Sequence, residues 1–337
     1  MAETTQTGGG AWRSLTELPE ALQPSEYGQL PLDDWVEWFV KDLLVPNFRP
    51  FFQAVEWPVN QVLSGLEAAL QGIPFIAFFV LAPLLAWRFA GRGVAIFTAI
   101  ALFAIDIIGV WPETMTTLSM ILTAVIFCAA VGLPVGIAMA RSDTLASIMR
   151  PVLDIMQTIP PFVYLVPIVM LFGVGIVPGV IATIIFALPP VVRLTNLGIR
   201  QVQAELVEAG FAFGSTRRQV LWEVQIPLAL RTIMAGLNQT LMLALSMVVI
   251  AALIGAGGLG LTVYTGLGRL DVGGAFVGGL GIVLLAIVLD RITQALGDPT
   301  GQAGAHWTFG GTLRRFFSSG ERTRSAPGAA PSAARAK

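Results

Sequence analysis

The most informative stretch of this chain is Glu208-Ala209-Gly210-Phe211-Ala212-Phe213-Gly214, followed a few residues later by Val224-Gln225-Ile226-Pro227. It lies in a polar island between two apolar blocks, each long enough to cross a bilayer as a helix. A polar island between two membrane spans must lie in water on one side of the membrane.

The island is expected to contain a short helix over residues 203–213 whose apolar and small side chains offer a surface to a partner. Gly214 can take the left-handed conformation that ends a helix, and Ser215 can cap the next helix. Pro227 is expected to separate that second helix from the membrane span behind it. The alternative is an amphipathic loop that lies on the lipid surface, but the spacing of Gly and Pro favours a docking element.

Composition predicts a membrane protein. Hydrophobic residues make up 55% of the 337 residues, charged residues only 12%, and the mean hydropathy is +0.76. Soluble domains of this length do not have such a composition. We therefore expect an all-α polytopic helical bundle with about seven transmembrane helices. The expected spans are 73–90, 93–111, 115–140, 152–174, 176–193, 230–256 and 273–295.

The basic residues predict the orientation. If the amino terminus lies outside, 16 of the 20 Lys and Arg residues fall in the inner loops and in the carboxyl-terminal tail. The opposite orientation would leave them outside, against the positive-inside rule. A multi-pass protein of the cell (inner) membrane is thus expected, with a cytoplasmic carboxyl terminus and a cytoplasmic polar island.

The first part of the chain, residues 1–72, has a different composition from the rest. It holds ten acidic and three basic residues, a net charge of about −7, and no apolar stretch typical of a cleaved signal. We expect an extracytoplasmic tail with amphipathic helices at 32–45 and 59–70 that lie on the outer membrane interface. The alternative is a docking surface for an external partner.

Two further regions complete the predicted organisation. Residues 73–296 are expected to form the transmembrane domain, with a cytoplasmic loop at 203–227. Residues 297–337 are rich in Gly, Ala, Ser, Pro and Arg, a composition typical of a largely disordered tail.

Several motifs indicate no catalytic chemistry. The glycine pattern at 255–260 ends an apolar run too long for a strand, so it is interpreted as a break in a membrane helix rather than a dinucleotide site. Lys41 and Lys337 are the only lysines, and neither stands in a phosphate loop. Cys128 and His306 are too few for a metal site. We expect no catalytic residue, cofactor, metal or nucleic acid for this chain, so a partner must hydrolyse any ATP.

Polar residues and prolines inside the spans mark a candidate translocation path. Polar groups at membrane depth usually face the interior of a bundle, and prolines bend the helices that contain them. The alternative is that these side chains form hydrogen bonds that hold helices together. The candidate path residues are Gln157, Thr158, Tyr164, Asn238 and Gln239.

The polar island resembles the cytoplasmic EAA loop of ABC importer permeases. Gly210, Val224 and Ile226 replace the residues usual in that family by small or apolar ones. The resemblance implies that the loop docks onto a cytoplasmic ABC ATPase. The residues at the family's positions are Glu208, Ala209, Gly210, Gly214, Val224, Ile226 and Pro227.

The resemblance extends from about Asp33 to Leu296. There the chain is similar to the permease of osmoprotectant glycine betaine/proline ABC importers, through segments such as 156–160, 162–173 and 238–251. This implies a type I importer permease fold and two permease copies. It also implies two cytoplasmic ATPases that bind ATP and Mg, and a periplasmic or extracellular substrate-binding protein. The implied cargo is glycine betaine, often with proline betaine or proline, taken up under osmotic stress.

Quaternary ammonium groups are commonly bound by aromatic cages, and no such cage is evident in the spans. We therefore expect selectivity to reside mainly in the binding protein. The principal alternative is a permease for choline or another quaternary amine or amino acid. A secondary transporter driven by an ion gradient would show two matching halves, which the sequence lacks. A membrane scaffold would need neither kinked polar spans nor a docking loop.

Overall fold

The fold comes from a computed structural model that describes Trp35, Trp38 and residues 45–297. The predicted helix at 32–45 and the predicted disordered tail therefore lie almost wholly outside the described residues. Within the described part every element is helical. Residues 54–297 belong to one compact unit, and the beginning of the helix that starts at Val45 belongs to another.

The elements follow one another with short connections. The helices of the described part are α3 (Val45–Gly72), α4 (Phe75–Ala90), α5 (Arg92–Ile107), α6 (Trp111–Arg141), α7 (Asp143–Thr158), α8 (Pro161–Phe172), α9 (Ile176–Arg200), α10 (Ala204–Ala212), α11 (Arg217–Gln219), the π-helical η4 (Val220–Gln225), α12 (Ile226–Ala251), the 3-10 turn η5 (Ala252–Ile254), α13 (Leu259–Gly268) and α14 (Val272–Gly297).

Four helical stretches of the described part are long and apolar enough to cross a membrane, and there are up to six spans if each of two bent pairs counts as one. The four are α6, α9, α14 and the continuous stretch Arg217–Ile254. The bent pairs are Pro50–Gly72 with Phe75–Ala90, and Asp143–Thr158 with Pro161–Phe172. The predicted polytopic helical bundle is confirmed, although helix boundaries and bends differ from the predicted blocks.

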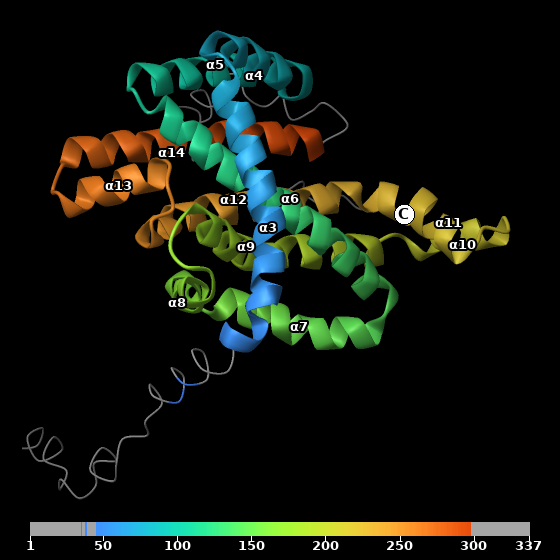
Figure 1. Ribbon diagram of the computed structural model, residues 1–337. Coiled ribbons are helices and arrows are strands. Elements are labelled where there is room, and N and C mark those ends of the chain that lie inside the picture. Colours follow the sequence, from blue (N-terminus) through green and yellow to red (C-terminus); the bar gives the residue numbers. More distant parts are fainter. Residues whose placement is uncertain (1–34, 36–37, 39–44, 298–337) are drawn as a thin grey trace, which may run out of the picture. The chain divides into compact units, whose positions relative to one another are not determined.

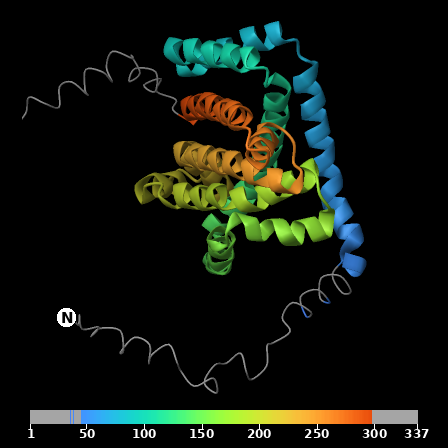
Figure 2. The ribbon, with the colours of Figure 1, turned by 90° about the vertical axis from the view of Figure 1, so that its left-hand side faces the viewer.

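The spans are arranged in layers. In both views the α4–α5 hairpin lies at one side, followed by α14, then α12, then α9, with α7 and α8 at the other side (Figures 1 and 2). The pair of α9 and α12 forms the centre of the bundle, and α6 packs against both. The predicted helix at 59–70 belongs to the longer α3, whose Val59 and Leu63 are buried in the main core.

Small residues let the central helices approach closely. A Cβ added to Gly136 of α6 would lie 2.6 Å from Cβ of Thr195 on α9. Such contacts at glycine are typical of helix packing in membranes. The main buried core of the bundle includes Ile121, Val191 and Val248.

A sharp bend separates α7 from α8. The predicted span 152–174 is therefore not one helix, because the axes of α7 and α8 differ by 98°. Pro160 and Pro161 cause the break, since neither has an N–H for the helical ladder, and a residue before proline is driven to extended backbone. Ile159 accordingly has φ −67° and ψ 126°.

The glycine-rich segment at 255–260 is a helix break, as predicted. Gly255 takes a left-handed conformation with φ 78° after η5, and α13 starts four residues later. The hydroxyl of Thr117 on α6 accepts a hydrogen bond from the backbone N–H of Leu259 at 2.8 Å. This bond satisfies one of the free donors at the beginning of α13.

Candidate functional site

The predicted docking helix is present as α10. It begins after Gln203 and ends at Ala212, with Phe213 at its carboxyl-terminal cap. Gly214 follows with φ +83°, and its N–H bonds to the carbonyl of Phe211 at 2.9 Å. The left-handed conformation predicted for Gly214 is therefore the one found. Its backbone reverses the chain directly after the helix.

The next helix is capped one residue later than predicted. Thr216, not Ser215, is the amino-terminal cap of α11, and it forms a capping box with Gln219. The Thr216 N–H donates to Gln219 Oε1 at 2.9 Å, and the Gln219 N–H donates to Thr216 Oγ1 at 3.4 Å. The Thr-x-x-Gln spacing selects this cap, because only Thr216 has a partner three residues on that can return the bond.

The prediction for Pro227 is wrong. The helix is continuous from Arg217 to Ile254, and Pro227 lies in the first turn of α12. The π-helical segment η4 explains this result, since the N–H of Ile226 bonds to the carbonyl of Leu221, five residues back. A wider π turn changes the pairing just before the proline, and the first turn of α12 tolerates a residue without an N–H.

The surface of α10 is open. None of its residues is buried, and Glu208 and Ala209 are both exposed. We call the exposed apolar side chains here the coupling surface. It consists of Leu206, Phe211, Phe213 and Trp222, of which Phe213 is 91% exposed.

One close contact holds α10 against the following segment. A Cβ on Gly210 would lie 3.2 Å from Cγ2 of Val220 and 3.9 Å from Cγ2 of Val224. Gly210 therefore allows α10 to pack on η4, and Val224 lies on the inner side of the loop. Ile226 packs against the small core cluster that contains Leu221.

A charged cluster fixes the base of this loop. Arg200, the last residue of α9, donates to Asp143 Oδ1 at 2.6 Å, to the backbone carbonyl of Met139 at 2.8 Å and to Asn196 Oδ1 at 2.9 Å. These bonds join the end of α9 to the end of α6 and the beginning of α7. In the sequence, Arg200 was only one of the 16 basic residues expected on the inner side of the membrane. No local pattern reveals its partners.

The candidate path residues divide into two groups in space. Gln157, Thr158 and Tyr164 lie at the bend between α7 and α8, where the Tyr164 hydroxyl donates to the carbonyl of Met156 at 2.5 Å. This bond links the two helices across the break. The Tyr164 ring also contacts the ring of Phe186 on α9.

The second group lies between α12 and α14. Asn238 Nδ2 donates to Asp290 Oδ1 at 3.2 Å, and Thr293 Oγ1 donates to Asn238 Oδ1 at 2.6 Å. Asn238 thus takes part in an interhelical network, the alternative considered for such residues, whereas Gln239 is exposed. The sequence assigned no role to Asp290 or Thr293.

A further charged pair went unnoticed in the sequence. Arg193 of α9 donates to Asp154 of α7 at 2.5 Å, and both side chains remain partly exposed. The rule that charged residues in spans pair with one another could have suggested it. The two residues are 39 positions apart, so their pairing follows only from the packing of α7 on α9.

The described residues contain no group of three or more His, Cys, Asp or Glu side chains that could hold a metal ion. Cys128 is buried in α6, and its thiol donates to the carbonyl of Ile184 at 3.5 Å. The thiol is thus accounted for by helix packing.

Known proteins match this chain in sequence over most of its length. Residues 132–298 match the family model of the binding-protein-dependent transport system inner membrane component. The chain is 53% identical over 309 residues to the glycine betaine/proline betaine transport system permease protein ProW of Escherichia coli, covering 90% of this chain and 87% of the relative. It is 47% identical to the glycine betaine/carnitine transport permease protein GbuB of Listeria monocytogenes, covering 79% and 95% respectively.

A solved structure shows the same fold. A chain of the MetNI methionine ABC transporter in an inward-facing conformation superposes with a TM-score of 0.50 at 24% identity, over 58% of this chain and 95% of that one. Sequence identity over nearly the whole chain, a matching family model and the fold agree. The protein belongs to the family of binding-protein-dependent transport system inner membrane components, as a relative of the glycine betaine permeases.

Proposed function

We propose that this chain is the permease subunit of an ATP-driven importer for glycine betaine/proline-type compatible solutes. Two relatives with high identity are permeases of glycine betaine systems by name. The observation that carries the proposal for this chain is the coupling surface, an exposed apolar surface formed by α10, the residue that follows it and η4. Solvated loops seldom gather several large apolar side chains unless a partner covers them.

The partner of the coupling surface is a cytoplasmic ABC ATPase. Glu208 and Ala209 are exposed on α10, and Gly214 sets the turn that ends it. η4 and α12 continue directly from this loop as one helix. A displacement of α10 by the ATPase would therefore be transmitted along this helix to the centre of the bundle. The ATPase supplies ATP and Mg binding, and this chain carries no cofactor and no catalytic residue.

The path for the solute passes the bend between α7 and α8. Gln157, Thr158 and Tyr164 lie there, and the break at the two prolines frees backbone carbonyls at membrane depth. Asn238 and Gln239 lie on α12, which continues from the coupling loop, and Asn238 bonds Asp290 and Thr293 on α14. Movement of α12 would therefore change the surroundings of these polar groups.

The assembly contains a second copy of this chain, two ATPases and an external substrate-binding protein in the lipid bilayer. The amino terminus lies outside and the carboxyl terminus is cytoplasmic. This orientation agrees with the basic residues of the predicted inner loops, and it puts the coupling surface on the ATPase side.

Reconstitution tests the proposal. The full chain, its ATPase and its binding protein are placed in proteoliposomes, and uptake of labelled glycine betaine is followed with ATP inside. We expect uptake that depends on ATP and on the binding protein. The chain purified alone should hydrolyse no ATP above background. Uptake that needs an ion gradient instead of ATP would overturn the proposal.

Competition in the same vesicles addresses the alternative cargo. Unlabelled proline betaine and proline should compete with glycine betaine, whereas choline should compete weakly. If choline competes best, the chain is the permease of a choline system, and the coupling assignment still stands.

A further inference from the structure

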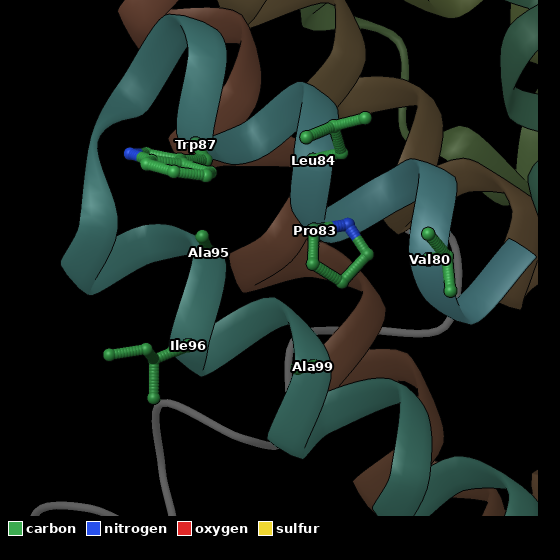
Figure 3. A pocket seen from close by; sticks show the side chains of 7 residues that line it. All are labelled: Val80, Pro83, Leu84, Trp87, Ala95, Ile96 and Ala99. Atoms are coloured by element: carbon green, nitrogen blue, oxygen red, sulfur yellow. The ribbon is translucent and has the colours of Figure 1, made fainter.

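The α4–α5 hairpin carries an apolar groove that packing within the chain leaves open. Its volume is about 320 Å³. The helix α4 contributes Val80, Leu84 and Trp87, and α5 contributes Ala95, Ile96 and Ala99. Figure 3 shows Trp87 and Ala95 at the end nearest the turn, with Val80 and Ala99 at the other end.

The other face of the hairpin explains why the groove faces outward. Ala86, Ala90, Ala101 and Ile105 are buried, and both helices pack against α14. The groove residues Val80, Leu84, Trp87 and Ile96 are instead more than half exposed. In a membrane such a face meets lipid chains, because only apolar side chains are stable there.

One end of the groove is basic. Arg88 and Arg92 flank the turn at Gly91, and both are exposed. The Arg88 guanidinium carbon lies 5.7 Å from the centre of the Phe89 ring, and that of Arg92 lies 6.0 Å from the Trp87 ring. Neither arginine forms an ion pair with an acidic residue in the part of the chain that the structure describes.

Trp87 belongs both to the apolar groove and to the basic end of the hairpin. Its ring lines the groove and also lies beneath the guanidinium of Arg92. The acid on the same helix pair, Asp106, is fourteen positions from Arg92, or about 21 Å along α5. A ligand in the groove therefore meets apolar side chains along its length and the Arg92 guanidinium at the Trp87 end, and Arg88 lies in the neighbouring last turn of α4.

We propose that this groove binds one chain of an anionic phospholipid, with the phosphate headgroup at Arg88 and Arg92. Arginine matches phosphate in charge and in the geometry of its donors. Basic pockets between membrane helices bind anionic headgroups on the cytoplasmic side, and both arginines are among the basic residues expected on the inner side of the membrane. Indole rings are favoured at this depth of the interface.

The test measures lipid binding rather than transport. The full chain in detergent is titrated with dioleoyl phosphatidylglycerol or dioleoyl phosphatidylcholine, and bound lipid is counted by native mass spectrometry. Each arginine near anionic lipid contributes about a fivefold preference. We expect one phosphatidylglycerol to bind about thirtyfold better than phosphatidylcholine.

Three variants and a control separate the charge from the groove. R88Q/R92Q should lose the preference, whereas R88K/R92K should keep most of it. A95F fills the groove without changing charge and should lose the tightly bound lipid. The control R141Q/R150Q removes two exposed arginines elsewhere and should behave like the parent chain.

Several results would overturn the proposal. They are equal binding of the two lipids by the parent chain, preference retained in R88Q/R92Q, full binding by A95F, or an equal loss in the control. Efficient disulfide cross-linking between copies through I96C would show that a second chain covers the groove, which also contradicts lipid binding. Size-exclusion profiles of each variant check that the chain is folded.

Discussion

At the scale of single residues, Gly214 is important because of its backbone and not because of its surroundings. It has φ +83°, and nothing lies within 4 Å of the position where a Cβ would stand. A side chain there meets no clash within this chain. Its cost arises from the left-handed conformation, in which β-branched residues are strained.

Gly214→Val is expected to reduce coupling. The strain of about 1–2 kcal/mol shifts the equilibrium of the loop by roughly tenfold, so uptake and stimulation of the ATPase by loaded binding protein should fall by about that factor. Gly214→Asn should retain most activity, because asparagine tolerates the left-handed region. Both are measured in proteoliposomes at matched protein content.

Gly279 offers a matched control for this comparison. It also has open space around its Cβ position but lies within α14 at ordinary helical φ. Gly279→Val should leave uptake unchanged. If Gly214→Val and Gly279→Val are both fully active, the conformation of Gly214 is not needed for coupling.

At the scale of elements, α10 is a helix that lies exposed on the surface of the chain and is not buried in the bundle. Gly210 makes a close contact with η4, and the large apolar side chains of the coupling surface are exposed. A nine-residue helix of this kind is marginal by itself. Docking to a partner would stabilise it.

Substitutions on the open side of α10 should weaken docking without unfolding the chain. Ala209→Trp adds bulk, and Glu208→Lys reverses a charge, at exposed positions where the structure itself has room. Both should lower ATPase stimulation by about tenfold or more, as expected for a loss of 1.4 kcal/mol or more in binding, while membrane abundance stays normal.

Glu205→Lys serves as the control, since Glu205 lies in the first turn of α10 and outside the resembling motif. It should have a smaller effect than Glu208→Lys. Full stimulation by Ala209→Trp and Glu208→Lys together would show that α10 does not couple the ATPase.

The contact between α9 and α6 leads to a second prediction at the scale of elements. Arg200 donates to the Met139 carbonyl in the last turn of α6, a favourable position for a cation at a helix end. Its ion pair with Asp143 is mostly exposed, so that pair alone contributes little. Arg200→Met should therefore lower the thermal unfolding midpoint more than Asp143→Asn.

The expected costs are about 1–2 kcal/mol for Arg200→Met and below about 1 kcal/mol for Asp143→Asn. Thermal unfolding of both variants in the same detergent, read by near-ultraviolet circular dichroism, gives the order. A larger shift for Asp143→Asn would mean that the ion pair, and not the bond to α6, holds the base of the coupling loop.

At the scale of the whole molecule, one continuous helix links the two ends of the bundle. The stretch Arg217–Ile254 is 38 residues long, about 57 Å at helical rise. It begins beside α10 and ends at the break before α13, and Figure 1 shows α10 and α13 at opposite ends of the bundle. The coupling surface and the α13–α14 turn therefore lie at opposite ends of the bundle.

The orientation is testable with single cysteines. With Cys128 replaced by Ala, Ser14→Cys should react with an impermeant thiol reagent added to intact cells, whereas Ser325→Cys should react only after permeabilisation. The bias of arginines toward the predicted inner loops gives this order. The reverse labelling pattern would place α10 outside and would contradict its role in coupling to an ATPase.

The sequence by itself determined the membrane character, the helical class, the short helix α10 and the glycine turn after it, because hydrophobic length and glycine or proline positions act locally along the chain. It also placed the break at 255–260. These features need no knowledge of distant residues. The same local reasoning was wrong at Ser215 and Pro227, where a neighbouring side chain and a π turn decided the outcome.

Only the tertiary structure decided which polar side chains meet. The pairs Arg193–Asp154, Arg200–Asp143 and Asn238–Asp290 join residues far apart in sequence, and packing of α7, α9, α12 and α14 brings them together. The same holds for the groove between α4 and α5, which exists because one face of the hairpin is buried on α14. Interactions of this kind depend on how helices are arranged in space, and a single sequence does not encode that arrangement in any local pattern.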